Sequence, residues 1–288
     1  MLSEDRFGMR PLWNALLDIY KEFASVCDAH GLRYFVMEGN AIGAARHKGF
    51  VPWDDDFDVA MPRPDYERFV MIAKESLPPH LKFIDWHNTP EFTLSFGKIQ
   101  ETRREIVEGV EKEAGFMLSN GLYIDILVID GCPSGRIPMM IYASKVFVYG
   151  AMLRFKVEQF RRETGKGRCF WLFGCLMSIL VPWRLTAASV RRVIDALLRS
   201  VPFDGAENTW RVGGTMRLTM TFPKSIWEGV DWLEFDTLKV PLPIGWREYL
   251  QIQYGDYMRL PPLECQRPSH SYSWRCPWWL GPTRADNG

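Results

Sequence analysis

The sequence predicts a mixed α/β (α+β) fold. Between about residues 10 and 30, apolar side chains recur at three- and four-residue spacing, which is typical of a helix with one buried face. Two runs rich in aromatic and β-branched residues, at 32–39 and 122–129, have the composition of buried strands. The chain has 288 residues and 47% hydrophobic content, which is sufficient for a large core.

After the first strand, we expect Gly39 and Asn40 to turn the chain into a short Ala-rich helix. The first backbone N–H groups of that helix could hold a phosphate. The next strand is expected at 57–61, and Pro64 suits the first turn of the helix after it. Further strands are expected at 82–86, 93–99 and 122–129. These elements form the first of three parts, a catalytic core over residues 1–136.

Residues 137–200 are strongly apolar with basic flanks, and we expect a helical insertion there. The longest uncharged run, 169–183, has 15 residues, fewer than the ~20 that a membrane-spanning helix needs. Such a segment suits a helix lying in a membrane interface, near a lipid-linked glycan. A buried helical hairpin or a dimer contact has the same periodicity, so the sequence leaves these interpretations open.

The last part, residues 201–288, returns to short strands, expected at 216–222 and 233–244. A helix is expected at 246–254, with Gly255 as its C-terminal signal.

The most informative cluster consists of aspartates at positions 54, 55, 56 and 58. If 57–61 is a strand, the side chains of Asp54, Asp56 and Asp58 point to one face, and Asp55 points elsewhere. Carboxylates this close repel one another unless a cation compensates. Mg²⁺ (or Mn²⁺) binds carboxylate oxygens together with substrate phosphates, so the cluster indicates phosphoryl or nucleotidyl transfer.

Two other interpretations of the aspartates compete with a transferase metal site. A solvated turn would account for acidic residues beside Pro52, but the run continues directly into an apolar strand. A calcium-binding EF-hand loop matches at its first three acidic positions. It fails at Val59, where glycine is required, and at Asp65, where glutamate is required.

The order of strand, turn, short helix and Asp-x-Asp strand resembles the active site of the nucleotidyltransferase superfamily. More narrowly, residues 46–69 (RHKGFVPWDDDFDVAMPRPDYERF) are similar to the signature of the LicD family, which includes bacterial phosphocholine transferases and animal fukutin-related proteins. Residues 121–131 are similar to its second acidic strand, and residues 253–262 to its C-terminal Tyr-Gly-Asp segment. The resemblance implies a nucleotidyltransferase-like mixed sheet flanked by helices, with an active site that residues 201–288 complete.

By this resemblance, Asp56 and Asp58 are metal ligands, and Asp54 is a further ligand or its neighbour. Asp125 supplies another carboxylate, because a lone charge on a strand that is apolar on both faces is costly unless it is paired or metal-bound. Its role stays open between a metal ligand, a base for the acceptor hydroxyl, and the ion-pair partner of a lysine.

The resemblance also implies contacts to the donor near the phosphate-binding turn. Cations there would neutralise a diphosphate as its bond breaks, although a solvated surface loop has the same composition. The expected contacts are Gly39, Asn40, Arg46, His47, Lys48 and Lys98.

The function implied is Mg²⁺-dependent transfer of a phosphorylated alcohol to a glycan hydroxyl, with release of CMP. Phosphocholine from CDP-choline, or another CDP-alcohol, is the expected donor, and a lipopolysaccharide, teichoic acid or lipid-linked sugar is the expected acceptor. Two alternatives are a nucleotidyltransferase that uses an NTP and releases pyrophosphate, and an inactive membrane-associated scaffold in glycan assembly.

Charge and cysteine content limit the partners and the compartment. The 35 basic and 35 acidic residues balance, so we expect no nucleic-acid partner. The six cysteines form no C-x-x-C pair, and no apolar signal segment opens the chain. We therefore expect a cytoplasmic protein, peripheral at the inner face of the membrane if 137–200 contacts lipid.

Overall fold

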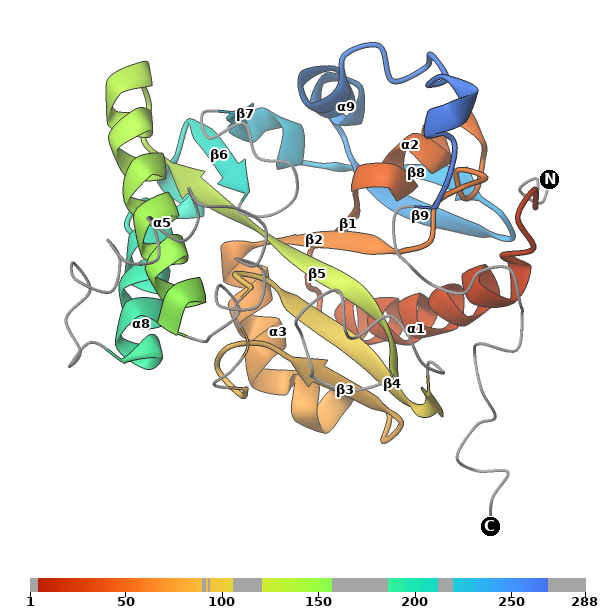
Figure 1. Ribbon diagram of the computed structural model, residues 1–288, viewed down its shortest axis with the longest axis horizontal. Helices are drawn as coiled ribbons and strands as arrows, with labels where there is room; N and C mark the ends of the chain where they lie inside the picture. Colours follow the sequence, from red (N-terminus) through yellow and green to blue (C-terminus); the bar gives the residue numbers. More distant parts are fainter. Residues whose placement is uncertain are drawn as a thin grey trace, which may run out of the picture.

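The computed structural model describes residues 5–89, 92, 94–105, 121–156, 186–211 and 220–268. Within these residues, six α-helices surround a curled mixed sheet of seven strands, and a two-stranded sheet lies beside it (Figure 1). The predicted mixed α/β class is confirmed.

Helices and strands alternate from α1 to α3, and three consecutive strands, β3 to β5, follow. The helices are α1 (Arg10–Ala29), α2 (Glu38–Arg46), α3 (Arg63–Ser76), α5 (Arg136–Lys156), α8 (Ala187–Leu198) and α9 (Trp246–Tyr254). The strands are β1 (Phe35–Val36), β2 (Asp58–Pro62), β3 (Leu81–Ile84), β4 (Gly97–Glu105), β5 (Gly121–Cys132), β6 (Asn208–Arg211), β7 (Phe222–Pro223), β8 (Val230–Phe235) and β9 (Leu238–Pro243).

Strand β5 organises the large sheet, whose main order is β1-β2-β5-β4-β3. It runs parallel to β2 and antiparallel to β4. Because β5 has 12 residues, its last four extend beyond β4 and pair with β6, which in turn pairs with β7. Chain from the last third thereby joins the same sheet as the first third.

Helix α1 forms as predicted, because its apolar residues lie on one face. Leu12, Leu16 and Phe23 on that face are buried, and Phe23 meets Phe69 of α3 edge to face at 5.3 Å. In Figure 1, α1 and α3 lie on one side of the sheet, and α2, α9 and the β8–β9 hairpin lie toward the other. The candidate site is on the α2 and α9 side.

The turn into α2 differs from its prediction. The expected strand 32–39 is reduced to the two residues of β1, and α2 already begins at Glu38. Gly39 and Asn40 therefore lie inside the first helical turn. The chain reverses at Glu38 instead, whose φ of 49° lies in the left-handed region.

Other boundaries are corrected as well. The strand expected at 93–99 begins only at Gly97 and continues to Glu105, paired with β5. The strands expected at 82–86, 122–129 and 233–244 are present as β3, β5 and the β8–β9 hairpin. Of the strand expected at 216–222, residues 216–219 lie outside the described part of the chain, and β7 contains Phe222.

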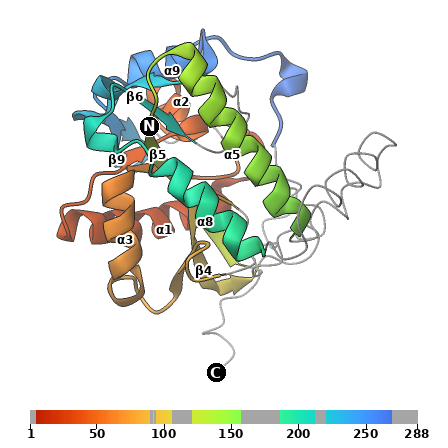
Figure 2. The same cartoon turned by 90° about the vertical axis from the view of Figure 1, so that its left-hand side faces the viewer.

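Helices α5 and α8 lie side by side at one end of the molecule (Figure 2). Met139 and Val146 of α5 pack with Val190 and Ile194 of α8 in a second core. The run 169–183 lies outside the described residues. Among the helices that are described, none is long and apolar enough to cross a membrane.

Candidate functional site

Three charged side chains form a row across the middle of the sheet. Asp58 of β2 pairs in register with Asp125 of β5, and Asp125 pairs with Lys98 of β4. Residues paired in this way point to the same face of a sheet. Lys98 Nζ lies 2.5 Å from Asp125 Oδ1, so the lysine partner considered for Asp125 is present.

Two further aspartates join this row from the loop before β2. Asp56 repels both Asp54 and Asp58, and Asp58 is also repelled by Asp125 and Asp54. Removal from water, followed by these like charges, raises the pKa of both Asp54 and Asp58 well above its usual range, and Lys98 offsets only part of this effect on Asp58. The four predicted aspartates thus converge into one site of unbalanced negative charge.

Asn40 holds the aspartates in place. Its Oδ1 accepts the backbone N–H of Asp58 at 2.7 Å. Its Nδ2 donates to the backbone oxygen of Asp56 at 3.2 Å and to Asp54 Oδ2 at 3.4 Å. Since Asn40 is fully buried with its amide bonded to this loop, the geometry supports a positioning role, and its expected contact to the donor stays a prediction.

Gly39 allows Asp54 to approach the first turn of α2. A Cβ added at Gly39 would lie 2.4 Å from Asp54 Oδ2, which is closer than any side chain permits. The glycine is therefore needed for this close approach and not for an unusual backbone angle. It also lines the neighbouring pocket.

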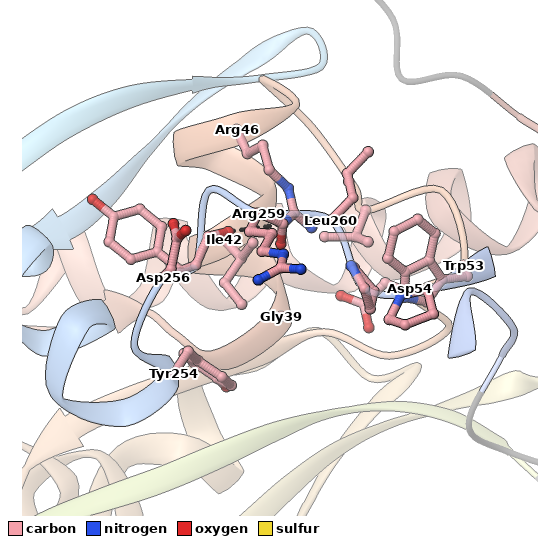
Figure 3. Close-up of a pocket in the computed structure, with 13 residues that line it drawn as sticks. Gly39, Ile42, Arg46, Trp53, Asp54, Tyr254, Asp256, Arg259 and Leu260 are labelled. Atoms are coloured by element: carbon pink, nitrogen blue, oxygen red, sulfur yellow. Dashed lines mark hydrogen bonds between the residues drawn. The ribbon is translucent and has the colours of Figure 1, made fainter. Parts of the chain in front are cut away.

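A pocket of about 570 Å³ adjoins the aspartates at Asp54 (Figure 3). Its walls come from α2, from the loop before β2, and from the segment after α9, so the Tyr-Gly-Asp segment lies at the site as the resemblance implies. The lining residues are Gly39, Ile42, Arg46, Val51, Trp53, Asp54, Tyr254, Asp256, Tyr257, Arg259, Leu260, Pro261 and Pro262.

The three basic residues at the C-terminal end of α2 have different positions. Arg46 lines the pocket, and its Nη1 donates to the backbone oxygens of Tyr257 at 2.7 Å and Arg259 at 3.1 Å. Its Nε donates to His47 Nε2 at 2.9 Å. Burial, and then Arg46, lower the pKa of His47 to about 4, so this imidazole is neutral at pH 7.

Lys48 lies outside the pocket lining, and its expected contact with the donor stays a prediction. Its Nζ forms an exposed ion pair with Glu234 of β8 at 2.8 Å. Lys98, the other predicted lysine, is part of the charged row. Of the four predicted cations, Arg46 lines the pocket and Lys98 contacts the aspartates.

Glu38 and Arg259 lie at the site but were not among the predicted site residues. The Glu38 carboxylate accepts the hydroxyl of Tyr254 and pairs with Arg211 of β6, which ties α2 to the last third of the chain. Arg259 lines the pocket, and its position in the Tyr-Gly-Asp segment was the signal available for it. Glu38 had no comparable signal, because its partners are more than 170 residues away in the sequence.

The carboxylates of the site suit a hard divalent ion, although the described residues form no closed cage of protein ligands. Among the described residues, no group of three or more His, Cys, Asp or Glu side chains is arranged to hold a metal ion. Mg²⁺, however, is usually bound by one or two carboxylates, with waters and substrate phosphates as the other ligands. The mutually repelling carboxylates of Asp56 and Asp58 fit that mode.

The mixed α/β fold and its acidic row are consistent with a nucleotidyltransferase-type domain, and comparison with known proteins points to the same class. Residues 31–125 match the LicD/FKTN/FKRP nucleotidyltransferase domain, a stretch that contains all four aspartates of the site. Over these residues the chain is similar to a LicD-type domain, and the resemblance to the LicD family is confirmed.

Two relatives extend this result. The chain is 28% identical over 265 residues to the lipopolysaccharide cholinephosphotransferase LicD of Haemophilus influenzae, covering 88% of this chain and 92% of the relative. It is 35% identical over 60 residues to the human ribitol 5-phosphate transferase FKRP, covering 21% of this chain and 12% of that protein. The predicted class, a phosphotransferase enzyme, is confirmed by the first similarity.

Proposed function

We propose that this enzyme transfers phosphocholine from CDP-choline to a sugar hydroxyl of a lipopolysaccharide-type glycan and releases CMP. The observation that carries the proposal is the row of aspartates beside the pocket, in a chain similar over 88% of its length to a lipopolysaccharide cholinephosphotransferase. Another CDP-alcohol remains the alternative donor, because a human relative is named a ribitol 5-phosphate transferase.

In the proposed reaction, the acceptor oxygen attacks the phosphorus that carries choline. The bond from that phosphorus to the bridging oxygen breaks, and CMP leaves with the electron pair. Asp56 and Asp58 would hold Mg²⁺ (or Mn²⁺), which when bound neutralises charge on the diphosphate. Asn40 keeps both aspartates in position through the bonds described above.

Asp125 is proposed either to complete the metal site or to take the proton of the acceptor hydroxyl. Lys98, which is bonded to it, balances part of the charge of the row. An Asp125→Asn variant separates the two roles. A lost ligand weakens metal binding, so excess Mg²⁺ would restore much of the rate, whereas a lost base leaves the rate low at any Mg²⁺ concentration.

Contact with the inner face of the membrane is also part of the proposal. Helix α5 exposes an apolar stripe that includes Ile137 (72% exposed), Ile141 and Phe147 (56% exposed), flanked by the exposed bases Arg136 and Lys145. A helix of this kind suits an anionic lipid surface. Flotation of the protein with anionic vesicles tests the contact, and an Ile141→Glu variant that floats equally well would contradict it.

The decisive experiment is Mg²⁺-dependent CMP release from CDP-choline, CDP-ribitol and CDP-glycerol in the presence of an unmodified lipopolysaccharide acceptor. We expect CMP from CDP-choline with the unaltered enzyme and none with the Asp56→Ala, Asp58→Ala double variant. Pyrophosphate release from an NTP would instead indicate the nucleotidyltransferase alternative. No turnover and no metal binding would favour a scaffold.

A further inference from the structure

The pocket beside the aspartates has two chemically different ends. In the view of Figure 3, Tyr254 and Asp256 lie toward one end and Trp53 and Asp54 toward the other, with the guanidinium of Arg259 between them. An anionic diphosphate suits the middle, where Arg259 is. The two ends of the pocket are then left for the two groups that the diphosphate joins, the alcohol and the nucleoside.

Tyr254 is fixed in its orientation. It is the last residue of α9, and its hydroxyl donates to the Glu38 carboxylate, which also pairs with Arg211. A ring tied at its hydroxyl presents its faces and edge to the pocket rather than its polar atom. Among side chains, an aromatic face is well suited to contact a cation that has no hydrogen to donate.

A tight turn brings Asp256 back beside Tyr254. Gly255 has a φ of 71°, in the left-handed region, and the N–H of Tyr257 donates to its backbone oxygen at 2.8 Å. Arg46 then holds the segment over α2 through its bonds to the backbone of residues 257 and 259. The wall formed by residues 254–259 is therefore built on defined contacts.

Asp256 and Arg259 keep their charged groups available to a ligand. Within the described part of the chain, neither side chain has an ion-pair partner, and the bond between the two residues is a backbone one. A carboxylate and an aromatic ring at one end of a pocket attract a cation, whereas Arg259 repels one and attracts phosphate.

We propose that Tyr254 and Asp256 bind the quaternary ammonium group of the donor and make the enzyme selective for a choline-bearing donor over neutral CDP-alcohols. Arg259 binds the diphosphate, which lies between the ammonium group and the cytosine base of the donor. The inference rests on the proposed function for its donor class. It adds the residues that distinguish choline from a neutral alcohol at the same site.

The test measures binding and turnover separately. Dissociation constants for CDP-choline and CDP-glycerol, determined by calorimetry with Mg²⁺, give the choline preference of the unaltered enzyme and of Asp256→Asn and Tyr254→Leu. We expect each variant to bind CDP-choline about tenfold more weakly, and CDP-glycerol within about twofold of the unaltered enzyme. Tyr254→Phe, which keeps the ring, is expected to retain most of the preference.

Glu248→Gln serves as the matched control, because it removes one exposed negative charge from α9 outside the pocket lining. Equal losses for CDP-choline and CDP-glycerol, or an unaltered enzyme that binds both equally, would overturn the inference. Such a result leaves the proposed function standing if CMP is still released from CDP-choline. Turnover of no CDP-alcohol, with the choline preference in binding intact, would contradict the proposed function instead.

Discussion

Strand β5 carries two acidic residues whose surroundings are opposite. Asp130 is buried and receives two bonds from Arg63, Nε to Oδ1 at 2.6 Å and Nη2 to Oδ2 at 2.9 Å. Asp125, five residues earlier, shares Lys98 with Asp58, which Asp54 and Asp56 also repel. The fully paired carboxylate joins helix α3 to the sheet, and the poorly compensated group keeps its attraction for an external cation.

Strand β5 thus carries one carboxylate that serves stability, Asp130, and one that serves the candidate site, Asp125. A buried carboxylate with a bidentate arginine has its charge satisfied by the protein, so its loss is expected to appear in folding. Carboxylates that repel one another lower stability and gain a partner only when a cation and substrate bind.

The largest effect is expected for Asp58→Asn. The amide keeps the shape of the carboxylate but cannot supply its charge, so turnover should fall by about 10³-fold or more. Because burial, and then like charges, raise the pKa of Asp58 in the folded protein, neutralising it should leave the melting temperature unchanged or raise it. CMP release and thermal unfolding are measured on the same preparation. Full turnover, or a marked loss of stability, would contradict the contrast.

Asp130→Ala should show the reverse pattern. It leaves the buried Arg63 without its close partner, with Asp195 at 3.8 Å as the remaining carboxylate, and should cost roughly 3–5 kcal/mol of folding free energy. Urea unfolding measures this cost, and the rate per folded molecule should stay near that of the unaltered enzyme. Asp18→Ala, which breaks an exposed pair with Lys21, is the control and should cost less than about 1 kcal/mol.

Gly39→Ala tests whether the position of the aspartates matters as much as their charge. The added methyl group would meet Asp54 Oδ2 at 2.4 Å and displace it, and a shift of this size should lower turnover by about 10- to 100-fold. Gly150→Ala in α5 is the matched control. Nothing lies within 4 Å of its added Cβ, so stability should rise by about 0.5–1 kcal/mol without change in rate. An unchanged rate in Gly39→Ala would show that Asp54 tolerates displacement.

The smallest effect is expected from His47, whose pKa falls to about 4 in the folded protein. The unfolded chain binds this proton below about pH 6.5, whereas the folded chain binds it only near pH 4. The stability contributed by the neutral imidazole is therefore complete above about pH 6.5 and decreases as the pH falls toward 4. The free energy of unfolding of His47→Gln, measured with denaturant, should lack this part of the pH dependence. If the variant and the unaltered protein have the same pH profile, the titrating group is not His47.

Much of the fold could be predicted because its signals are local. The periodicity of α1, Pro64 in the first turn of α3, and Gly255 after α9 each depend on residues within one or two helical turns. The turn at Glu38 could not be predicted, because a left-handed glutamate beside an available glycine contradicts local preference. Its side chain is bonded to Tyr254 and Arg211, and those contacts are tertiary.

The candidate site, too, could be predicted only in part. The spacing of Asp54, Asp56 and Asp58 is a property of the sequence, and it indicated a cation site without any structure. The same spacing did not distinguish Arg46, which lines the pocket, from Lys48, which pairs with Glu234. Both lie at the C-terminal end of α2 and are positively charged, so only the packing of α2 against β8 and the 254–262 segment separates them.

Local sequence is enough to predict the helices, the acidic strand and the expected class of chemistry, since each depends on residue types at short, fixed spacing. Tertiary structure decided which charges are balanced: the register of β2, β5 and β4 places Asp58, Asp125 and Lys98 in one row. It also decided the wall of the pocket, where residues 254–262 meet α2 from more than 200 positions away. The physical reason is that electrostatic energy depends on distance and on exclusion of water, and both are set only when distant segments pack together.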